Sequence, residues 1–159
     1  MIKIRPATLV DAQKIGSVFD SAVAEGWKYL GELARNPTFL WRNGTRSWRS
    51  TRRQHALLVA VNELNELVGY TAVHPREGEM GLLFVHPDHA GHGLVRMLLA
   101  AAHDAMRAAG RREVFLYTHE QKKRALEVYE TAGHRRDGTI RESNFRGVHL
   151  REPRLVKPL

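Results

Sequence analysis

Three histidines and one aspartate stand close together in the ten-residue segment HPDHAGHGLV, residues 86–95. Histidine and carboxylate side chains are common ligands of zinc and related ions. The candidate ligands here are His86, Asp88, His89 and His92. A metal site needs its ligands to converge and to be held by outer partners, and neither the spacing nor the intervening proline enforces this. We therefore expect no metal, and histidines of a surface loop are the simpler interpretation.

The glycines of the same segment indicate a different chemistry. Gly91 and Gly93 lie between an apolar run that ends at Val85 and a helix-like run that begins at Leu94. The first N–H groups of a helix lack partners within the helix and favour an anion such as phosphate, which glycine lets approach the backbone. An ordinary strand-to-helix turn would use glycine too, and the segment is neither a Walker A motif nor a dinucleotide fingerprint. Both interpretations stay open on these residues alone.

The patterns on either side predict the elements that position this segment. Apolar and alternating runs predict strands at 2–5, 55–61, 66–74, 80–86, 112–118, 134–142 and 148–157. Helical spacing predicts helices from Thr8 to about Ala24, at about 38–53 with interruptions, at 93–109 and at 121–131. The strand, helix and strand between 80 and 118 form a crossover that favours a parallel pair. We expect one three-layer α/β domain over residues 1–159.

Composition restricts the class of protein. The 159 residues include 25 Lys and Arg against 17 Asp and Glu, a formal net charge of +8, and no cysteine. The lack of cysteine excludes disulfides and thiolate chemistry and agrees with the cytoplasmic location that we expect. The first residues lack the apolar core of a signal peptide, and no window of 18 apolar residues exists, so no membrane contact is expected. The positive charge favours anionic partners without choosing among them.

Two segments resemble the GNAT superfamily of N-acetyltransferases. LLFVHPDHAGHGLVRMLLAAAHDAM resembles the family's coenzyme A-binding segment, with a match over Val85–His89 and at Gly93. ALEVYETAGH (125–134) resembles the family's Ala-x-x-x-Tyr-x-x-x-Gly-Phe helix, matched by Ala125, Tyr129 and Gly133. This chain departs from the family at Ala90, His92, Val95, Lys122 and His134. The order of the predicted elements agrees with the family along nearly the whole chain.

The resemblance implies a three-layer α/β/α fold with a mixed sheet of about seven strands that is splayed at its centre. Coenzyme A would lie between the strand that ends at Val85 and the strand at 113–118, with its pyrophosphate on the backbone N–H groups of residues 90–95. The thioester would bond backbone near Phe84 and Val85. The implied cofactor-binding residues are Phe84, Val85, Ala90, Gly91, His92, Gly93, Leu94, Val95, Arg96 and Lys122.

Acetyl transfer needs a neutral amine, donors for the oxyanion and a proton for the leaving thiolate. The motif match makes Tyr129 the candidate acid, although a helix tyrosine packed in the core is the structural alternative. Glu79, just before the central strand, is the candidate base, directly or through water. Other residues that we considered for the base or for the acceptor site are Glu77, His74, His119, Asn144 and Phe145.

The stretch WRNGTRSWRSTRR (41–53) bears on the acceptor. If it is helical, Arg42, Arg46, Arg49 and Arg53 share a face. A solvated face is the simpler interpretation, and an anion-binding surface would favour an acidic group on the acceptor or an acidic carrier protein. Nucleic acid is not expected because no nucleic-acid motif is present. A homodimer is left open.

The resemblance as a whole implies an acetyl-CoA-dependent N-acetyltransferase. The acetyl group would move to the primary amine of a small molecule by direct attack on the thioester. Two alternatives stay open: an acyltransferase that uses another, carrier-bound donor, and a non-catalytic module that binds coenzyme A.

Overall fold

The computed structural model describes residues 1–29, 56–145 and 147–159. The helix expected at 38–53 and the Arg/Trp stretch 41–53 lie outside the described residues. In the described ranges no helix combines the length and the apolar character that crossing a membrane requires.

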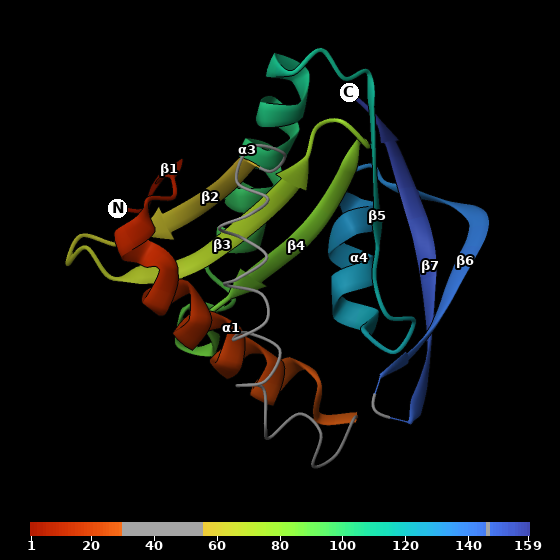
Figure 1. Cartoon of the computed structure of the whole chain (residues 1–159), viewed down its shortest axis with the longest axis horizontal. Helices are drawn as coiled ribbons and strands as arrows, with labels where there is room; N and C mark the ends of the chain where they lie inside the picture. Colours follow the sequence, from red (N-terminus) through yellow and green to blue (C-terminus); the bar gives the residue numbers. More distant parts are fainter. Residues whose placement is uncertain (30–55, 146) are drawn as a thin grey trace.

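One seven-stranded sheet forms the middle layer (Figure 1). Its strands are β1 Lys3–Pro6, β2 Ala56–Val61, β3 Leu67–His74, β4 Glu79–Val85, β5 Glu113–Tyr117, β6 Arg135–Phe145 and β7 Val148–Pro158. They are arranged in the order β1-β2-β3-β4-β5-β7-β6. Every neighbouring pair is antiparallel except β4 and β5, which are parallel. The mixed α/β fold with a seven-stranded sheet predicted from the sequence is confirmed.

The parallel pair at the centre is splayed. The only register partners of β4 and β5 in the described sheet are Glu79 and Phe115, and the N–H of Phe115 donates to the carbonyl of Gly78 at 3.0 Å. Beyond this point the two strands diverge, as Figure 1 shows. The backbone edges of the two C-terminal strand ends are therefore free of each other, and the sheet opens where β4 ends.

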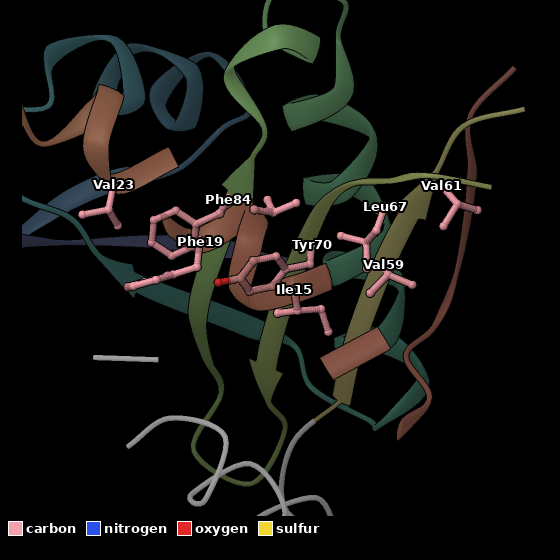
Figure 2. Packing of buried hydrophobic residues seen from close by; sticks show 9 residues of the cluster. Ile15, Phe19, Val23, Val59, Val61, Leu67, Tyr70 and Phe84 are labelled. Carbon is pink, nitrogen blue, oxygen red and sulfur yellow. The ribbon is translucent and has the colours of Figure 1, made fainter. Parts of the chain in front are cut away.

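The helices cover both faces of the sheet. In the described ranges they are α1 Ala12–Gly26, α3 Leu94–Ala108 and α4 Lys123–Thr131, with short 3-10 turns at Leu9–Asp11 and Pro87–His89. Helix α1 packs on one face through the hydrophobic cluster drawn in Figure 2: Ile15, Val18, Phe19, Val23, Val59, Val61, Leu67, Tyr70 and Phe84. Helices α3 and α4 share a second cluster with β5 and β7, which includes Leu99, Met106, Val114, Leu126 and Leu155.

The structure refines three predicted boundaries. The helix predicted from Thr8 is divided into a 3-10 turn and α1, because the Asp11 carboxylate accepts from both the N–H and the hydroxyl of Thr8 at 2.7 and 2.9 Å. Strand β4 begins at Glu79, one residue earlier than predicted. The predicted strand 134–142 extends through 145, and its register shifts between Arg136 and Ile140.

Candidate active site

The glycine-containing segment connects β4 to α3. Gly91 and Gly93 both adopt positive φ, 87° and 75°, a conformation that other residues rarely take. A Cβ atom at either position would meet no atom within 4 Å, so backbone conformation rather than crowding requires glycine here. Gly93 is the N-cap of α3 and supplies no side-chain cap. The first N–H groups of α3 therefore remain available to an anion.

The histidines of this turn do not form a metal cluster. The Nδ1 atom of His86 accepts from the N–H of Asp88 at 3.3 Å, and the ring centroids of His86 and His89 are 6.0 Å apart. Over the described part of the chain, no group of three or more His, Asp or Glu side chains has the arrangement of a metal site.

A first cavity of about 450 Å³ lies beside the glycine turn. It is lined by every residue that the sequence predicted to bind the cofactor except His92. Residues that the sequence did not assign to the cofactor also line it: Ala22, Trp27, Leu83, Arg124, Ala125, Val128 and Tyr129. Three of its lining residues, Arg96, Lys122 and Arg124, are cationic. Uncapped helix N–H groups and these cations make the first cavity suited to an elongated anionic ligand.

A second cavity of about 350 Å³ opens on the other side of the same wall. Its polar lining residues come from β5, β6, β7 and the segment after β5: Tyr117, Thr118, His119, Arg141 and Glu152. Five residues line both cavities: Trp27, Leu83, Phe84, Lys122 and Tyr129. The two cavities thus meet at the splayed ends of β4 and β5.

Tyr129 stands at this meeting point. It projects from α4, and its ring lies 5.9 Å from that of His134 in an edge-on arrangement. Burial raises the pKa of the Tyr129 phenol to about 12. The phenol is therefore protonated at neutral pH and can donate a hydrogen bond to a group in either cavity.

Lys122 also faces both cavities. Its Nζ atom lies 5.8 Å from the ring centroids of Trp27 and of Phe84. Burial lowers the pKa of the Lys122 amine below its usual value. A cation between two aromatic faces is attracted by their quadrupoles, so the aromatic wall and the lysine hold each other in place.

His119 is the buried histidine of the second cavity, 7% exposed. Its Nδ1 atom is hydrogen-bonded to the hydroxyl of Tyr29, and its Nε2 atom lies 3.6 Å from Oε1 of Glu152. Its ring centroid lies 4.8 Å from that of Trp27. Burial lowers the pKa of His119, and the Glu152 carboxylate opposes part of that change. The imidazole is therefore neutral at pH 7.

Glu152 is held in the second cavity by two neighbours on β6. Arg141 donates to it through Nε at 3.0 Å and Nη2 at 3.3 Å, and the Ser143 hydroxyl donates to Oε2 at 3.3 Å. The Arg141 guanidinium also lies 4.1 Å from the ring centroid of Tyr117. These contacts fix a carboxylate that is only 9% exposed. Glu152 was not predicted from the sequence, because no local motif marks it.

The other sequence candidates for acid–base chemistry lie elsewhere. Glu79 is not among the described residues that line either cavity, and its Oε1 atom is 3.9 Å from Nη1 of Arg141. Glu77 is exposed in the β3–β4 turn, and the His74 ring lies against Gly81. Asn144 accepts from the N–H of Gly147 at 2.8 Å in the β6–β7 turn. The structure brings Tyr129 and His119 to one cavity and leaves Glu79 outside it.

Comparison with known proteins decides the family. The sequence profile of the acetyltransferase (GNAT) family matches residues 22–134, which is more than half of the chain. This chain belongs to the GNAT family of acetyltransferases. The mycothiol acetyltransferase of Saccharopolyspora erythraea is 37% identical to it over 76 residues, which are 46% of this chain and 25% of that protein. The match thus spans about a quarter of the length of that curated relative.

Solved GNAT structures share the fold over nearly their whole length. The GCN5-related N-acetyltransferase from Rhodopseudomonas palustris superposes with a TM-score of 0.80 at 18% identity, covering 99% of this chain and 95% of that one. The PaiA N-acetyltransferase from Thermoplasma acidophilum, solved with coenzyme A, gives 0.76 at 16% identity, with 100% and 99% covered. The phosphinothricin acetyltransferase from Sinorhizobium meliloti, solved with acetyl-CoA, gives 0.77 at 17% identity, with 99% and 88% covered.

Three of the departures from the GNAT motif lie in or directly after the turn beside the first cavity. Ala90 and Val95 replace motif side chains, yet both line the cavity, whereas His92 does not. Gly93, which retains the family glycine, keeps the left-handed conformation at the start of α3. In this GNAT chain the family glycine of the turn is retained while several neighbouring side chains differ from the motif.

Proposed function

We propose that this GNAT protein moves an acetyl group from acetyl-CoA to the primary amine of a small molecule. The observation that carries the proposal is the position of Tyr129, which lines both cavities. The first cavity holds the donor and the second holds the acceptor amine. The thioester then lies at the shared wall, where an amine in the second cavity can attack it directly.

The first cavity has the chemistry that coenzyme A requires. Its uncapped N–H groups at the start of α3 suit the pyrophosphate, and Arg96 and Arg124 supply positive charge beside them. Backbone groups of Phe84 and Val85, at the free edge of β4, suit the amides and the thioester of the pantetheine arm. Two solved structures with the same fold contain coenzyme A or acetyl-CoA, which further supports this donor.

Tyr129 acts at the leaving sulfur. As the carbon–sulfur bond breaks, the sulfur takes the electron pair and becomes a thiolate, whose parent thiol has a pKa near 8.5. The phenol of Tyr129, with its pKa of about 12, stays protonated and donates a hydrogen bond to that developing charge. Its role is thus to stabilise the transition state where charge collects on sulfur.

The size of the second cavity favours a small acceptor. About 350 Å³ is at the lower end of the range for small-molecule pockets and accommodates a short amine. Glu79, the base predicted from the sequence, stays a prediction. In the described structure it does not line the second cavity and contacts it only through Arg141, whose Nη1 atom lies 3.9 Å from its Oε1 atom.

The test is thiol release from acetyl-CoA with n-butylamine, 1,4-diaminobutane, tyramine and glycinamide as acceptors, with the product identified by mass spectrometry. Wild-type protein is expected to acetylate at least one of them, and acetyl-CoA is expected to raise its Tm. Tyr129→Phe should lower kcat about 100-fold with an unchanged acetyl-CoA Kd, because it removes only the transition-state donor.

The matched control is Tyr70→Phe, which removes the hydroxyl of a buried tyrosine that lines neither cavity. Binding of acetyl-CoA without turnover of any amine or other acyl-CoA would indicate a non-catalytic module. Turnover only with a longer or carrier-bound acyl thioester would replace the donor. Equal activity of Tyr129→Phe and wild type would remove Tyr129 from the mechanism.

A further inference from the structure

Three side chains from distant parts of the chain meet at the second cavity: two of them line it, and Tyr29, 39% exposed, lies beside them. Tyr29 follows α1, His119 follows β5, and Glu152 lies on β7. His119 and Glu152 line the cavity and are 7% and 9% exposed. The Tyr29 hydroxyl contacts one ring nitrogen of His119, and the Glu152 carboxylate faces the other. The sheet order explains the meeting, because β7 lies directly beside β5.

The two ring nitrogens of His119 are not equivalent. Nδ1 is hydrogen-bonded to the Tyr29 hydroxyl. The Tyr29 phenol stays neutral, because burial raises its pKa and the charge of Glu152 raises it further. Within the described residues, the nearest acidic oxygen to Nε2 is Oε1 of Glu152, whose distance of 3.6 Å exceeds hydrogen-bond length. In the tautomer with the proton on Nδ1, Tyr29 accepts that proton and the Nε2 lone pair points towards a carboxylate.

This arrangement is suited to a protonated amine. An ammonium group beside Nε2 and Oε1 can donate one hydrogen bond to each and removes the unfavourable approach of a lone pair to a carboxylate. Glu152 supplies the negative charge, although it shares that charge with Arg141 through bonds of 3.0 and 3.3 Å. We propose that His119 is the general base for the acceptor amine, that Glu152 binds its ammonium form, and that Tyr29 is a positioning residue that accepts from Nδ1–H of His119 once the ammonium lies beside Nε2.

This proposal rests on the proposed acetyltransferase function and adds the acceptor class, an aliphatic amine that is protonated in solution. The ammonium first gives one proton to Nε2 of His119, which later releases it to solvent. The neutral amine then attacks the thioester carbon, the carbon–nitrogen bond forms, and the carbon–sulfur bond breaks. The electron pair leaves on sulfur, and the second amine proton ends there. The products are an amide, free coenzyme A and one proton.

The charged groups around His119 agree with this role. Glu152 attracts the imidazolium that forms, whereas Lys122 and Arg141 repel it, and burial also favours the neutral ring. The ring is thus ready to accept a proton at pH 7 and returns it readily. Glu79 has no comparable position, because it lines neither cavity in the described structure and faces Arg141.

The decisive experiment compares the pH dependence of kcat/KM for wild type and His119→Gln, with n-butylamine as acceptor between pH 6.5 and 10. Wild type should reach a plateau near neutral pH. In His119→Gln the kcat/KM for n-butylamine should be about 100-fold lower than in wild type at pH 7. The kcat/KM of the variant should then rise about tenfold for each unit of increasing pH, because the neutral fraction of an amine with a pKa near 10.4 rises by the same factor.

Two further variants separate the roles. Glu152→Gln should raise the amine KM at least about tenfold and leave the acetyl-CoA KM unchanged, as expected for a lost charged hydrogen bond. Tyr29→Phe should lower amine kcat/KM and shift its pH profile. The matched controls are His149→Gln and Glu142→Gln, whose side chains are 60% and 54% exposed and pair with each other at 3.7 Å. Both controls should behave as wild type.

Nitrogen-15 NMR of histidine-labelled protein provides a readout that does not depend on turnover. With saturating n-butylamine and no acetyl-CoA, the His119 signals, assigned by their loss in His119→Gln, should show a protonated Nδ1 and an unprotonated Nε2 at pH 7.5. A proton on Nε2 would overturn the proposal. The proposal would also be overturned if His119→Gln lowered the amine kcat/KM by the same factor at every pH while acetyl-CoA still raised the Tm of the variant as it does for wild type. A wild-type protein that acetylates no amine would instead overturn the proposed function itself.

Discussion

The first and second cavities share a wall but are built from different parts of the chain. Most of the lining residues of the first cavity come from one stretch, Leu83–Arg96, and the groups that we propose to bind its ligand are mainly backbone N–H groups. The polar side of the second cavity comes from side chains far apart in sequence, such as His119 and Glu152. A backbone site tolerates changes of side chain, whereas a side-chain site depends on each residue. The difference explains how Ala90 and Val95 can depart from the family motif.

The largest predicted effect is a loss of folding stability in acid. It sets the lowest pH at which the activities of the two cavities can be compared. His103 and His134 are buried beside the second hydrophobic cluster, with their Nε2 atoms 3.0 Å apart. Burial is the main cause that lowers the pKa of both to about 4. Unfolding restores a pKa near 6.5, so the unfolded state binds more protons below that value. Stability is therefore full above pH 6.5 and falls as the pH decreases towards 4.

The free energy of unfolding should decrease by about 3 kcal/mol when the first histidine of this pair is protonated, because each unit of pKa difference between the folded and unfolded states corresponds to 1.36 kcal/mol. Urea unfolding at pH 8, 6 and 4.5 measures it. The double variant His103→Leu with His134→Phe should remove most of the pH dependence and leave kcat at pH 8 unchanged. An equally steep decrease in the double variant would place the acid sensitivity elsewhere. This measurement identifies the pH range in which an activity profile reports His119 rather than unfolding.

The next prediction tests whether the first cavity works through its backbone. Gly93→Val should raise the acetyl-CoA KM about 10- to 30-fold, equivalent to about 1.4–2 kcal/mol. The reason is that a β-branched residue resists the φ of 75° that Gly93 adopts, so the start of α3 must shift. The amine KM should stay the same. His92→Ala, which alters an exposed side chain in the same turn, should change the acetyl-CoA KM less than about twofold.

Steady-state kinetics with each substrate varied in turn provides both constants. If His92→Ala weakens acetyl-CoA as much as Gly93→Val does, the first cavity depends on side chains after all. The contrast between the two cavities would then fail.

The same contrast explains what could be predicted from the sequence. The turn from Phe84 to Arg96 was predictable because its residues are consecutive and local rules govern glycine and helix starts. The three-layer α/β class was predictable because hydrophobic periodicity and one crossover restrict the topology, whereas the splayed sheet was implied by the resemblance to the GNAT family. The site around His119 was only partly predictable, since Tyr29 and Glu152 reach it through strand order and burial rather than through any local pattern.

Glu79 illustrates a limit of another kind. Its place at the start of a central strand was predicted almost to the residue, and the structure puts it within β4. Its neighbour across the sheet, however, is Phe115, at the end where β4 and β5 are still joined. The first cavity lies at the opposite, splayed end of β4, and the second extends along β4 as far as Met80 but not to Glu79. Sequence alone places a residue along a strand but does not show at which end the sheet separates.

The smallest effect is predicted at Tyr70, beneath the wall that the two cavities share. Its ring lies 5.7 Å from that of Phe84 (Figure 2), and its buried hydroxyl has no hydrogen-bond partner among the described residues. A buried donor that has lost its water and gained no partner destabilises the native state. Tyr70→Phe should therefore raise the free energy of unfolding by about 1 kcal/mol, measured by urea unfolding at pH 8. Because the ring remains, Phe84 keeps its support and both KM values should be unchanged. A decrease in stability would mean that the hydroxyl has a partner in solution, and a rise in only one KM would show that the wall transmits changes to that cavity alone.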